Sequence, residues 1–288
     1  TLIKETLPFL NFGKLRANYG LTGNDQIQDY RYLQLWNTNT NTYQQNPTIS
    51  PGTDAPNADF AWETNRKLEA AIQLGFLKDK INIEISFYRN RSSNQLLSLV
   101  LPLSTGLSSV QRNLPAEVQN IGWEFDANFK LCNSNSFKWL TGFNLTIPKN
   151  KLISYPGLKT SGLDYKYQIG EPLSILKTYN ITVNKQTGLY TREDYNGDGK
   201  IDNNDRYLVK FLGQHFYGGL SNSLTYKQFN LDFLFSFTKQ NGRDYRAASL
   251  TVPGRGLVFS PNNQFSEVLS RWQNQNDEAT VQRYGTTS

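Results

Sequence analysis

The sequence predicts an all-β protein, an antiparallel up-and-down segment of a transmembrane β-barrel with about seven strands and long external loops. Three observations predict it: apolar and polar residues alternate with a period of two, short and long connections alternate between these segments, and 13% of the 288 residues are aromatic. This aromatic content argues against disorder. A spanning helix is excluded, because the densest apolar stretch, Leu96–Leu103, is far shorter than the ~20 residues such a helix needs.

The first four predicted strands follow from alternation alone. In residues 14–19 the odd positions are apolar and the even ones polar, and residues 81–88 repeat this phase. In residues 69–76 the apolar positions are even. Residues 121–131 are the most regular, because every odd position is apolar and every even one is polar or glycine. Successive strand side chains point to opposite faces, so each segment has an apolar and a polar face.

The last three predicted strands are less regular but keep the same period. Residues 137–147 alternate with two exceptions, and residues 216–226 are weakest, because Asn222 falls on the apolar face. Residues 229–238 alternate phenylalanine and leucine with polar residues, apart from Leu234. We predict that the apolar phase faces lipid and the polar phase faces a wet lumen. The side chains expected to face lipid include Trp123, Phe125, Phe129, Trp139, Phe143, Phe233 and Phe235.

The connections between these segments differ in length in a regular way. Short links lie at 77–80, 132–136 and 227–228, whereas long polar stretches fill 21–65, 90–120, 148–215 and 239 onward. In an up-and-down sheet, all short links then lie at one end and all long ones at the other. Outer-membrane barrels show this asymmetry, with short periplasmic turns, long external loops and tilted strands of ~9–11 residues.

The main alternative is a secreted calcium-dependent β-sandwich binding module. Sandwich strands also alternate, but they are usually about five or six residues long and their loops rarely sort by length. Seven strands cannot close a bacterial barrel of even strand number, so we expect residues 1–288 to be part of a single barrel domain. A plug domain and the final strands would then lie outside this chain.

The sparse cysteine and histidine content excludes several chemistries. Cys132 is the single cysteine and His215 the single histidine, so an intrachain disulfide, a cysteine metal cluster and a histidine-rich metal site are excluded. No nucleophile-elbow, Walker or GxGxxG pattern is present, and we predict no enzymatic activity. The net charge of +6 is spread along the chain, which does not favour nucleic-acid binding.

One acidic loop resembles a calcium-binding sequence. In DYNGDGKIDNND, oxygen-bearing residues stand at positions 1, 3 and 5, glycine at 6 and a carboxylate at 12, as in EF-hand loops. The residue at position 12 is aspartate instead of glutamate, and the alternative is a metal-free turn rich in Asn, Asp and Gly. We expect calcium here, if bound, to be structural and on the external side. The candidate ligands are Asp194, Asn196, Asp198, the backbone carbonyl of Lys200, Asp202 and Asp205.

Aromatic residues in the predicted loops are candidates for stacking on a substrate. Amphipathic rings can combine stacking with a polar contact. The candidates are Trp36, Tyr43, Trp62, Tyr165, Tyr167 and Tyr190.

Several short motifs resemble the SusC/RagA family of TonB-linked outer-membrane transporters. They occur in the family's order over nearly the whole chain. They are LRANYGLTGN at 15–24, WET at 62–64, FYR at 87–89, NIGWE at 120–124, GEP at 170–172, the acidic run 194–206, YGGLSN at 217–222, YK at 226–227, the strand 229–237 and RW at 271–272.

The resemblance implies a barrel of about 22 strands plugged by an N-terminal domain. It also implies residence in the outer membrane of a Gram-negative bacterium, in contact with outer-membrane lipid. Family members are energised by TonB, pair with a SusD-like surface lipoprotein and import oligosaccharides or peptides.

Overall fold

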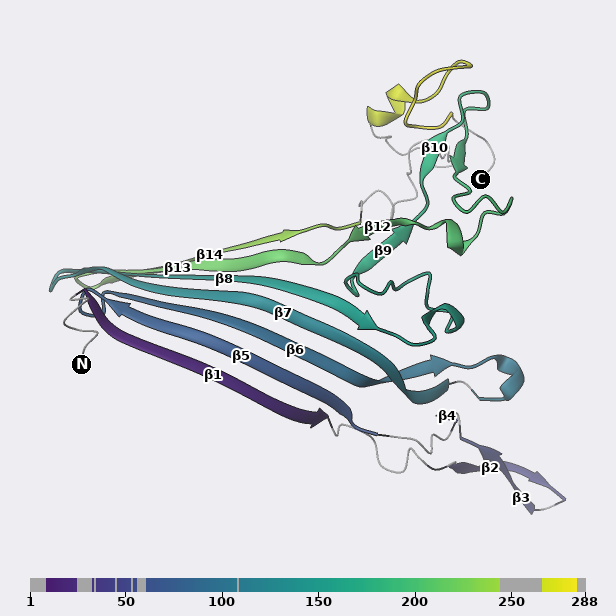
Figure 1. The fold of residues 1–288 in the computed structure, drawn as a ribbon, viewed down its shortest axis with the longest axis horizontal. Coiled ribbons are helices and arrows are strands. Elements are labelled where there is room, and N and C mark those ends of the chain that lie inside the picture. The colour runs from purple at the N-terminus through teal and green to yellow at the C-terminus, as the bar shows by residue number, and fades with distance from the viewer. Residues whose placement is uncertain are drawn as a thin grey trace. The chain divides into compact units, whose positions relative to one another are not determined.

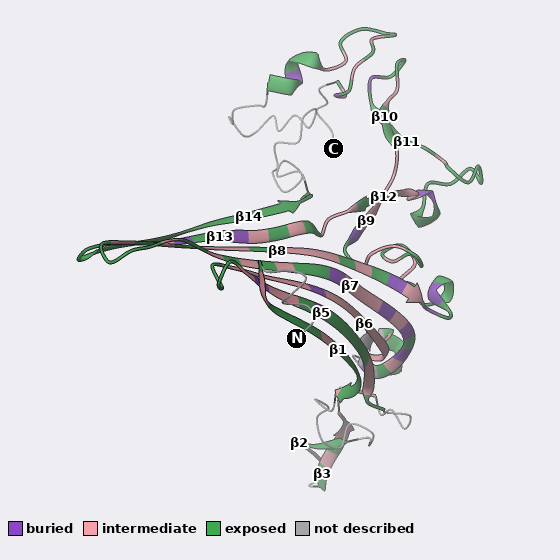
Figure 2. Ribbon diagram, turned by 60° about the vertical axis from the view of Figure 1, so that its left-hand side comes forward, coloured by how far each residue is buried: buried purple, intermediate pink, exposed green. Residues whose placement is uncertain are grey.

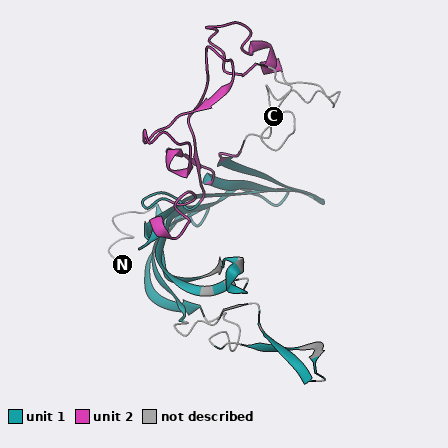
Figure 3. Cartoon of the chain, turned by 90° about the vertical axis from the view of Figure 1, so that its right-hand side faces the viewer, with its two compact units in different colours: residues 1–158, 168–173, 214–239 teal, residues 159–167, 174–213, 240–288 magenta. Residues whose placement is uncertain are grey.

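The computed structural model describes residues 9–24, 33, 35–44, 46–52, 54–55, 61–107, 109–243 and 266–283. The chain divides into two compact units (Figure 3). Unit 1 comprises residues 1–158, 168–173 and 214–239, and unit 2 comprises residues 159–167, 174–213 and 240–288.

Unit 1 is built on one long antiparallel sheet (Figure 1). Its main strands stand side by side in chain order, β1-β5-β6-β7-β8-β13-β14, which is up-and-down topology. The strands are β1 (Leu10–Asn24), β5 (Glu63–Phe76), β6 (Ile81–Val100), β7 (Ser109–Asn133), β8 (Phe137–Ser154), β13 (Gln214–Tyr226) and β14 (Phe229–Gln240).

Every predicted strand lies within one of these strands, so the predicted fold class is confirmed. The three short links join β5 to β6, β7 to β8 and β13 to β14, all at one end of the sheet (Figure 1). The tight first turn places Leu77, Lys78 and Asp79 at positive φ, and Lys227 does the same in the last. The long connections therefore all leave the opposite end.

The predicted long connection at 90–120 is wrong in extent. β6 continues to Val100 and β7 begins at Ser109, and 3-10 helix η1 (Leu103–Thr105) lies between them. Alternation fades here because apolar residues of this part of β7, such as Leu114 and Val118, stand at even positions and are buried, whereas the apolar residues of 121–131 stand at odd positions. The register shifts by a bulge beside Asn94 on β6, and Pro115, which has no N–H to donate, falls in the unpaired part of that bulge.

The connection between β1 and β5 also contains structure. β2 (Trp36–Tyr43) and β3 (Asn46–Pro51) form an antiparallel hairpin. β4 (Asp54–Ala55) pairs in parallel with the start of β7 at Ser109 and Val110. Residues 25–32 and 244–265, which belong to predicted long connections, lie outside the described residues.

The small buried core of unit 1 lies towards the long-connection end, on β7 and β8 (Figure 2). It includes Leu114, Val118 and Leu152, whereas large apolar side chains elsewhere on the sheet stay exposed. Within the described residues, no second long sheet covers the apolar face, so a β-sandwich is not favoured. No helix in the described part of the chain is long and apolar enough to cross a bilayer.

Unit 2 contains two small antiparallel pairs and several short helices. β9 (Ile175–Thr178) pairs with β12 (Leu208–Phe211), and β10 (Ile181–Val183) pairs with β11 (Tyr190–Arg192). The short 3-10 helices are η2 (Leu158–Thr160), which begins at the last residue of unit 1, η3 (Asn203–Asp205) and η5 (Ser266–Ser270).

A tryptophan fastens the C-terminal part of unit 2 to the β10–β11 hairpin. The Trp272 indole N–H donates to the Lys185 carbonyl at 3.1 Å, and its ring occupies the space where a side chain at Gly188 would lie. Gly188 also has φ +70°, a conformation in which glycine avoids the strain of a side chain. The Lys185 ammonium adds an ion pair with Glu278 at 2.6 Å.

Candidate functional site

The antiparallel register assembles the polar positions of neighbouring strands into one continuous face. Glu84 on β6 pairs with Asp126 on β7, and Asp126 pairs with Asn144 on β8. The Arg16 guanidinium reaches across β5 to form an ion pair with Glu84. The Asn128 amide donates to the Asp126 carboxylate at 2.7 Å. This face is thus a hydrogen-bonding wall that suits contact with water and polar molecules.

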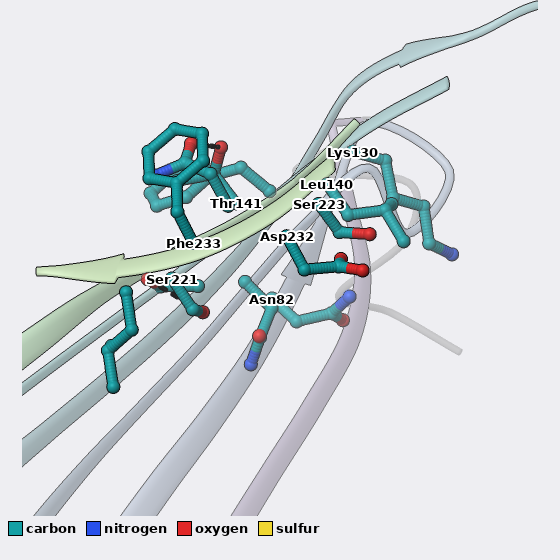
Figure 4. Close-up of a pocket in the computed structure, with 13 residues that line it drawn as sticks. Asn82, Lys130, Leu140, Thr141, Ser221, Ser223, Asp232 and Phe233 are labelled. Atoms are coloured by element: carbon teal, nitrogen blue, oxygen red, sulfur yellow. Dashed lines mark hydrogen bonds between the residues drawn. The ribbon is translucent and has the colours of Figure 1, made fainter. Parts of the chain in front are cut away.

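A hollow of about 570 Å³ lies on the sheet near the short-turn end (Figure 4). Asp232 and Phe233 of β14 lie on opposite sides of their strand in Figure 4, as the alternation requires. The hollow offers a carboxylate from Asp232, an ammonium from Lys130 and neutral donors and acceptors. The lining comprises Asn82, Asn128, Phe129, Lys130, Leu140, Thr141, Gly142, Ser221, Asn222, Ser223, Asp232, Phe233 and Leu234.

The opposite face of the sheet is apolar and rich in ring contacts. Phe87 on β6 lies against Trp123 on β7 with ring centroids 5.1 Å apart, and Phe143 on β8 stacks with Phe237 on β14 at 6.2 Å. Trp123, Phe233 and Phe235 are all exposed, and extended exposed apolar surface of this kind marks a contact with a membrane or a partner protein. The residues predicted to face lipid on β7 thus share a face with apolar neighbours, and the lipid contact itself stays a prediction.

The acidic loop of unit 2 is closed by its own backbone. The Asp194 carboxylate accepts from the N–H groups of Gly197 and Gly199, both at 2.8 Å. One Asp198 oxygen accepts from the N–H of Lys200 at 2.8 Å. In the described part of the chain, no three His, Cys, Asp or Glu side chains converge as a metal site. This geometry matches the turn alternative, and calcium binding stays a prediction.

Asp205, at position 12 of the loop, is the anchor of this turn. It is 0% exposed, and its two oxygens accept from the N–H groups of Tyr195 at 3.0 Å and Asp202 at 2.8 Å. Asp202 in turn caps η3 by accepting from the N–H of Asn204. The short aspartate arm therefore fits a site that is filled by backbone donors. Asn196 donates through its amide to the other Asp198 oxygen at 3.1 Å.

An aromatic and charged cluster flanks the loop. The Tyr195 and Tyr207 rings stack with centroids 4.0 Å apart, and the Tyr207 hydroxyl donates to the Glu193 carboxylate at 2.8 Å. Asn180 donates to the same carboxylate at 2.8 Å. The Asn180 hydrogen bond, and then that of Tyr207, lower the pKa of Glu193, and the same carboxylate raises the pKa of Tyr207. These contacts order the surface around the loop.

The predicted stacking residues are spread over several elements. Trp36 and Tyr43 stand at the two ends of β2, and Trp62 directly precedes β5. In unit 2, Tyr190 starts β11. Tyr165 and Tyr167 flank Lys166, whose ammonium lies over the Tyr167 ring, 5.0 Å from its centroid. All are exposed except half-buried Tyr167, and none lines the hollow of Figure 4.

Sequence reasoning did not group the residues of the hollow, because they come together only through strand register. Two of them, Phe129 and Phe233, were instead predicted to face lipid. Asn82, Lys130 and Asp232 are far apart in sequence, and each looks like an ordinary polar-face residue. Their position beside short turns was visible in the sequence, since each lies within about five residues of one. That proximity is the one feature that could have grouped them.

The fold indicates a class: a long-stranded, up-and-down sheet with one exposed apolar face and one polar face is typical of the wall of an outer-membrane β-barrel. The family model described as TonB dependent receptor-like, beta-barrel, matches residues 7–209. The chain belongs to this family, whose members are outer-membrane receptors and transporters and not enzymes. The Gram-negative outer membrane is therefore its location.

Curated relatives match most of the chain. It is 26% identical over 302 residues to TonB-dependent receptor P26 of Formosa agariphila, covering 96% of this chain and 30% of that protein. It is 27% identical over 282 residues to TonB-dependent receptor SusC of Bacteroides thetaiotaomicron, covering 88% of this chain and 27% of that protein. The chain thus spans less than a third of these relatives.

A solved structure described as the RagAB peptide transporter shares the fold. The TM-score is 0.74 at 20% identity, and the match covers 99% of this chain and 33% of that chain. A second structure, of the RagAB peptide importer in the open-open state, gives a TM-score of 0.73 at 20% identity, covering 99% of this chain and 32% of that chain. The predicted resemblance to SusC and RagA is confirmed.

Proposed function

We propose that this chain forms part of the barrel wall of a TonB-dependent importer of oligosaccharides or peptides. The observation that carries the proposal is the division of one sheet into an apolar face and a hydrogen-bonding polar face, in a chain of this receptor family. A polar face with ion pairs and amides suits a wet passage for hydrophilic cargo. The solved structure described as the RagAB peptide transporter supports peptides as a cargo class. The oligosaccharide class rests on the resemblance of the sequence motifs to the SusC/RagA family, and the part that contacts TonB would belong to the rest of the protein.

We further propose that a SusD-like surface lipoprotein covers the external side. Support comes from the resemblance to SusC and RagA and from the long connections, which all leave the same end of the sheet. β8 ends at Ser154 and pairs with β13, which begins at Gln214, so the intervening stretch starts and finishes at that end. The acidic loop would therefore be external, and its ordered surface is available to a lid.

Uptake by cells that carry the full-length transporter tests this function. Fluorescent maltooligosaccharides and fluorescent peptides of eight to twelve residues would be supplied separately, with and without the TonB complex. We expect one of the two classes to accumulate, in a TonB-dependent way. Neither class entering, or entry that does not depend on TonB, would contradict the proposal.

The partner is tested by solubilising the outer membrane and isolating the tagged transporter. A surface lipoprotein that copurifies at a one-to-one ratio is the expected result. Transporter isolated without any lipoprotein, while still active in uptake, would contradict the lid.

A further inference from the structure

A cluster of arginines interrupts the apolar face of unit 1 towards the long-connection end. Arg66 on β5 pairs directly with Arg91 on β6, and Arg89 stands two residues before Arg91 on the same face. We call Arg66, Arg89 and Arg91 the arginine cluster. On the same face of β8, Lys149 pairs with Ile121 and Lys151 pairs with Gln119, so positive charges lie on three of four neighbouring strands, β5, β6 and β8.

The arginine cluster lies where the apolar part of this face ends, on the side of the long connections. Phe87 and Trp123, which lie against each other, are paired across β6 and β7, and the next rung on this face pairs Arg89 with Ile121. The rung beyond joins Arg66, Arg91 and Gln119. In an outer-membrane barrel, aromatic girdles mark the interfaces, so cations one and two rungs beyond an aromatic layer stand at the level of lipid head groups.

Within the described residues, the positive charge of the cluster is only partly balanced. Arg91 forms an ion pair with Glu117 at 3.2 Å, and both Arg89 and Arg91 donate through Nε to the neutral Gln119 amide oxygen, at 3.0 and 2.9 Å. Like charges placed directly opposite each other on neighbouring strands destabilise a sheet. An anion placed among the guanidinium groups would remove this cost.

The cluster also encloses space. Arg66, Arg89 and Arg91 line a hollow of about 210 Å³ together with Tyr19 and Leu68. Its lining combines three guanidinium groups with a tyrosine ring and an aliphatic side chain. Guanidinium groups bind phosphate oxygens by paired, charge-assisted hydrogen bonds, and the apolar members suit the lipid portion of such a ligand.

We propose that the arginine cluster binds the phosphate groups of a phosphorylated lipid of the outer leaflet, on the outside of the barrel. The proposal rests on the apolar face being turned towards lipid, and it is independent of the cargo, TonB and the lipoprotein. Charge complementarity and the position beyond an aromatic layer single out a lipid head group. The apolar band directly below the cluster gives the acyl chains of that lipid a place to lie.

Native mass spectrometry of the full-length transporter in detergent tests the proposal, with bisphosphorylated lipid A as the probe. The test variant is R66Q/R89Q/R91Q. The matched control is K14Q/K67Q/K138Q, which removes three positive charges from the polar face of the same sheet. Each cation near an anionic membrane surface strengthens binding about fivefold. Removing three of them in the test variant should therefore weaken lipid A binding about a hundredfold, whereas the control should bind like wild type.

Further arms separate the source of the phosphate. Lipid A without its phosphates should bind wild type as weakly as bisphosphorylated lipid A binds the test variant, and equal concentrations of inorganic phosphate should not displace the lipid. E117Q removes the carboxylate that pairs with Arg91 and should strengthen binding about fivefold, which keeps the proposal testable if the triple variant does not fold. The proposal would be overturned if lipid A binding were unchanged in both the triple variant and E117Q, or if the control variant lost as much binding as the triple variant. It would also be overturned if dephosphorylated lipid A bound wild type as tightly as the bisphosphorylated form, or if inorganic phosphate displaced the lipid.

Discussion

Replacing Leu145 with arginine should destabilise the full-length barrel strongly, whereas the same change at the adjacent Asn144 should not. On β7 the apolar face runs from Ile121 to Leu131, ten positions apart. At ~3.3 Å per residue and a tilt of about 40°, these positions are roughly 25 Å apart along the membrane normal, which matches the apolar band of an outer-membrane barrel. Leu145 pairs with Phe125, four positions from Ile121, and therefore lies within a few ångströms of the midplane.

An arginine on the lipid face at this depth costs about 2–4 kcal/mol, and one near the interface costs about 0–1 kcal/mol. Asn144 points to the polar face beside Asp126, so its arginine variant should change the free energy of unfolding by less than about 1 kcal/mol. Ile121→Arg, at the upper edge of the band, is the depth control and should behave like Asn144→Arg.

Guanidinium titrations of the refolded protein in short-chain phosphatidylcholine vesicles would measure these differences, with heat-modifiable gel mobility as a check on folding. A free energy of unfolding that is much lower for Leu145→Arg than for Ile121→Arg and Asn144→Arg would support the predicted faces. If Asn144→Arg were the most destabilising of the three, the polar face would be the one against lipid and the reasoning would be refuted.

Three further changes probe other parts of the structure. Gly122→Val should cost about 1–3 kcal/mol of stability, because its Cβ would meet the Tyr88 ring on the neighbouring strand, and Tyr88→Ser should restore most of the loss in a double-mutant cycle. Asp198→Ala should make the acidic loop more sensitive to proteases without disturbing the strands, because it removes the carboxylate that accepts from the Lys200 N–H. Calorimetry decides between the two interpretations of the loop: calcium uptake by the wild type at millimolar concentration would indicate a metal site, whereas no uptake, with equal protease resistance in chelator, would leave a plain turn. The pKa of Glu193 is lowered in the fold, so its hydrogen bonds stabilise the loop region above pH 4.5, and this stabilisation is lost as pH falls through the lowered pKa. Hydrogen exchange around Glu193 should therefore be constant from pH 7 to 5, after correction for intrinsic rates, and accelerate below; a Glu193→Gln variant that showed the same acceleration would contradict this.

The sequence was sufficient to predict the strands wherever the two faces of the sheet meet different environments. Residues 121–131 alternate without exception, as expected if one side of the strand meets lipid and the other meets water. Residues 90–100 and 109–120 are also strand, but they do not alternate in this way. Periodicity therefore ended before the strands did, and the predicted 90–120 connection was too long.

The clusters on the sheet could not be predicted, because they depend on register. Arg66 and Arg91 are distant in sequence yet directly paired, and nothing in either local segment indicates this. The positive charge looked evenly spread along the chain, but folding gathers part of it on one face. The acidic loop shows the opposite case: its sequence pattern was clear, yet the same residues that suit a cation also suit backbone N–H donors.

If this segment is a barrel wall, its odd-numbered β7 residues between 123 and 129 are turned towards lipid. Single nitroxide labels at positions 123 to 130 of the full-length protein in vesicles, with Cys132 first replaced by serine, would measure accessibility to oxygen and to a water-soluble nickel complex. Oxygen accessibility should peak at 123, 125, 127 and 129, and nickel accessibility at 124, 126, 128 and 130. The reverse phase, or no two-residue period at all, would contradict it.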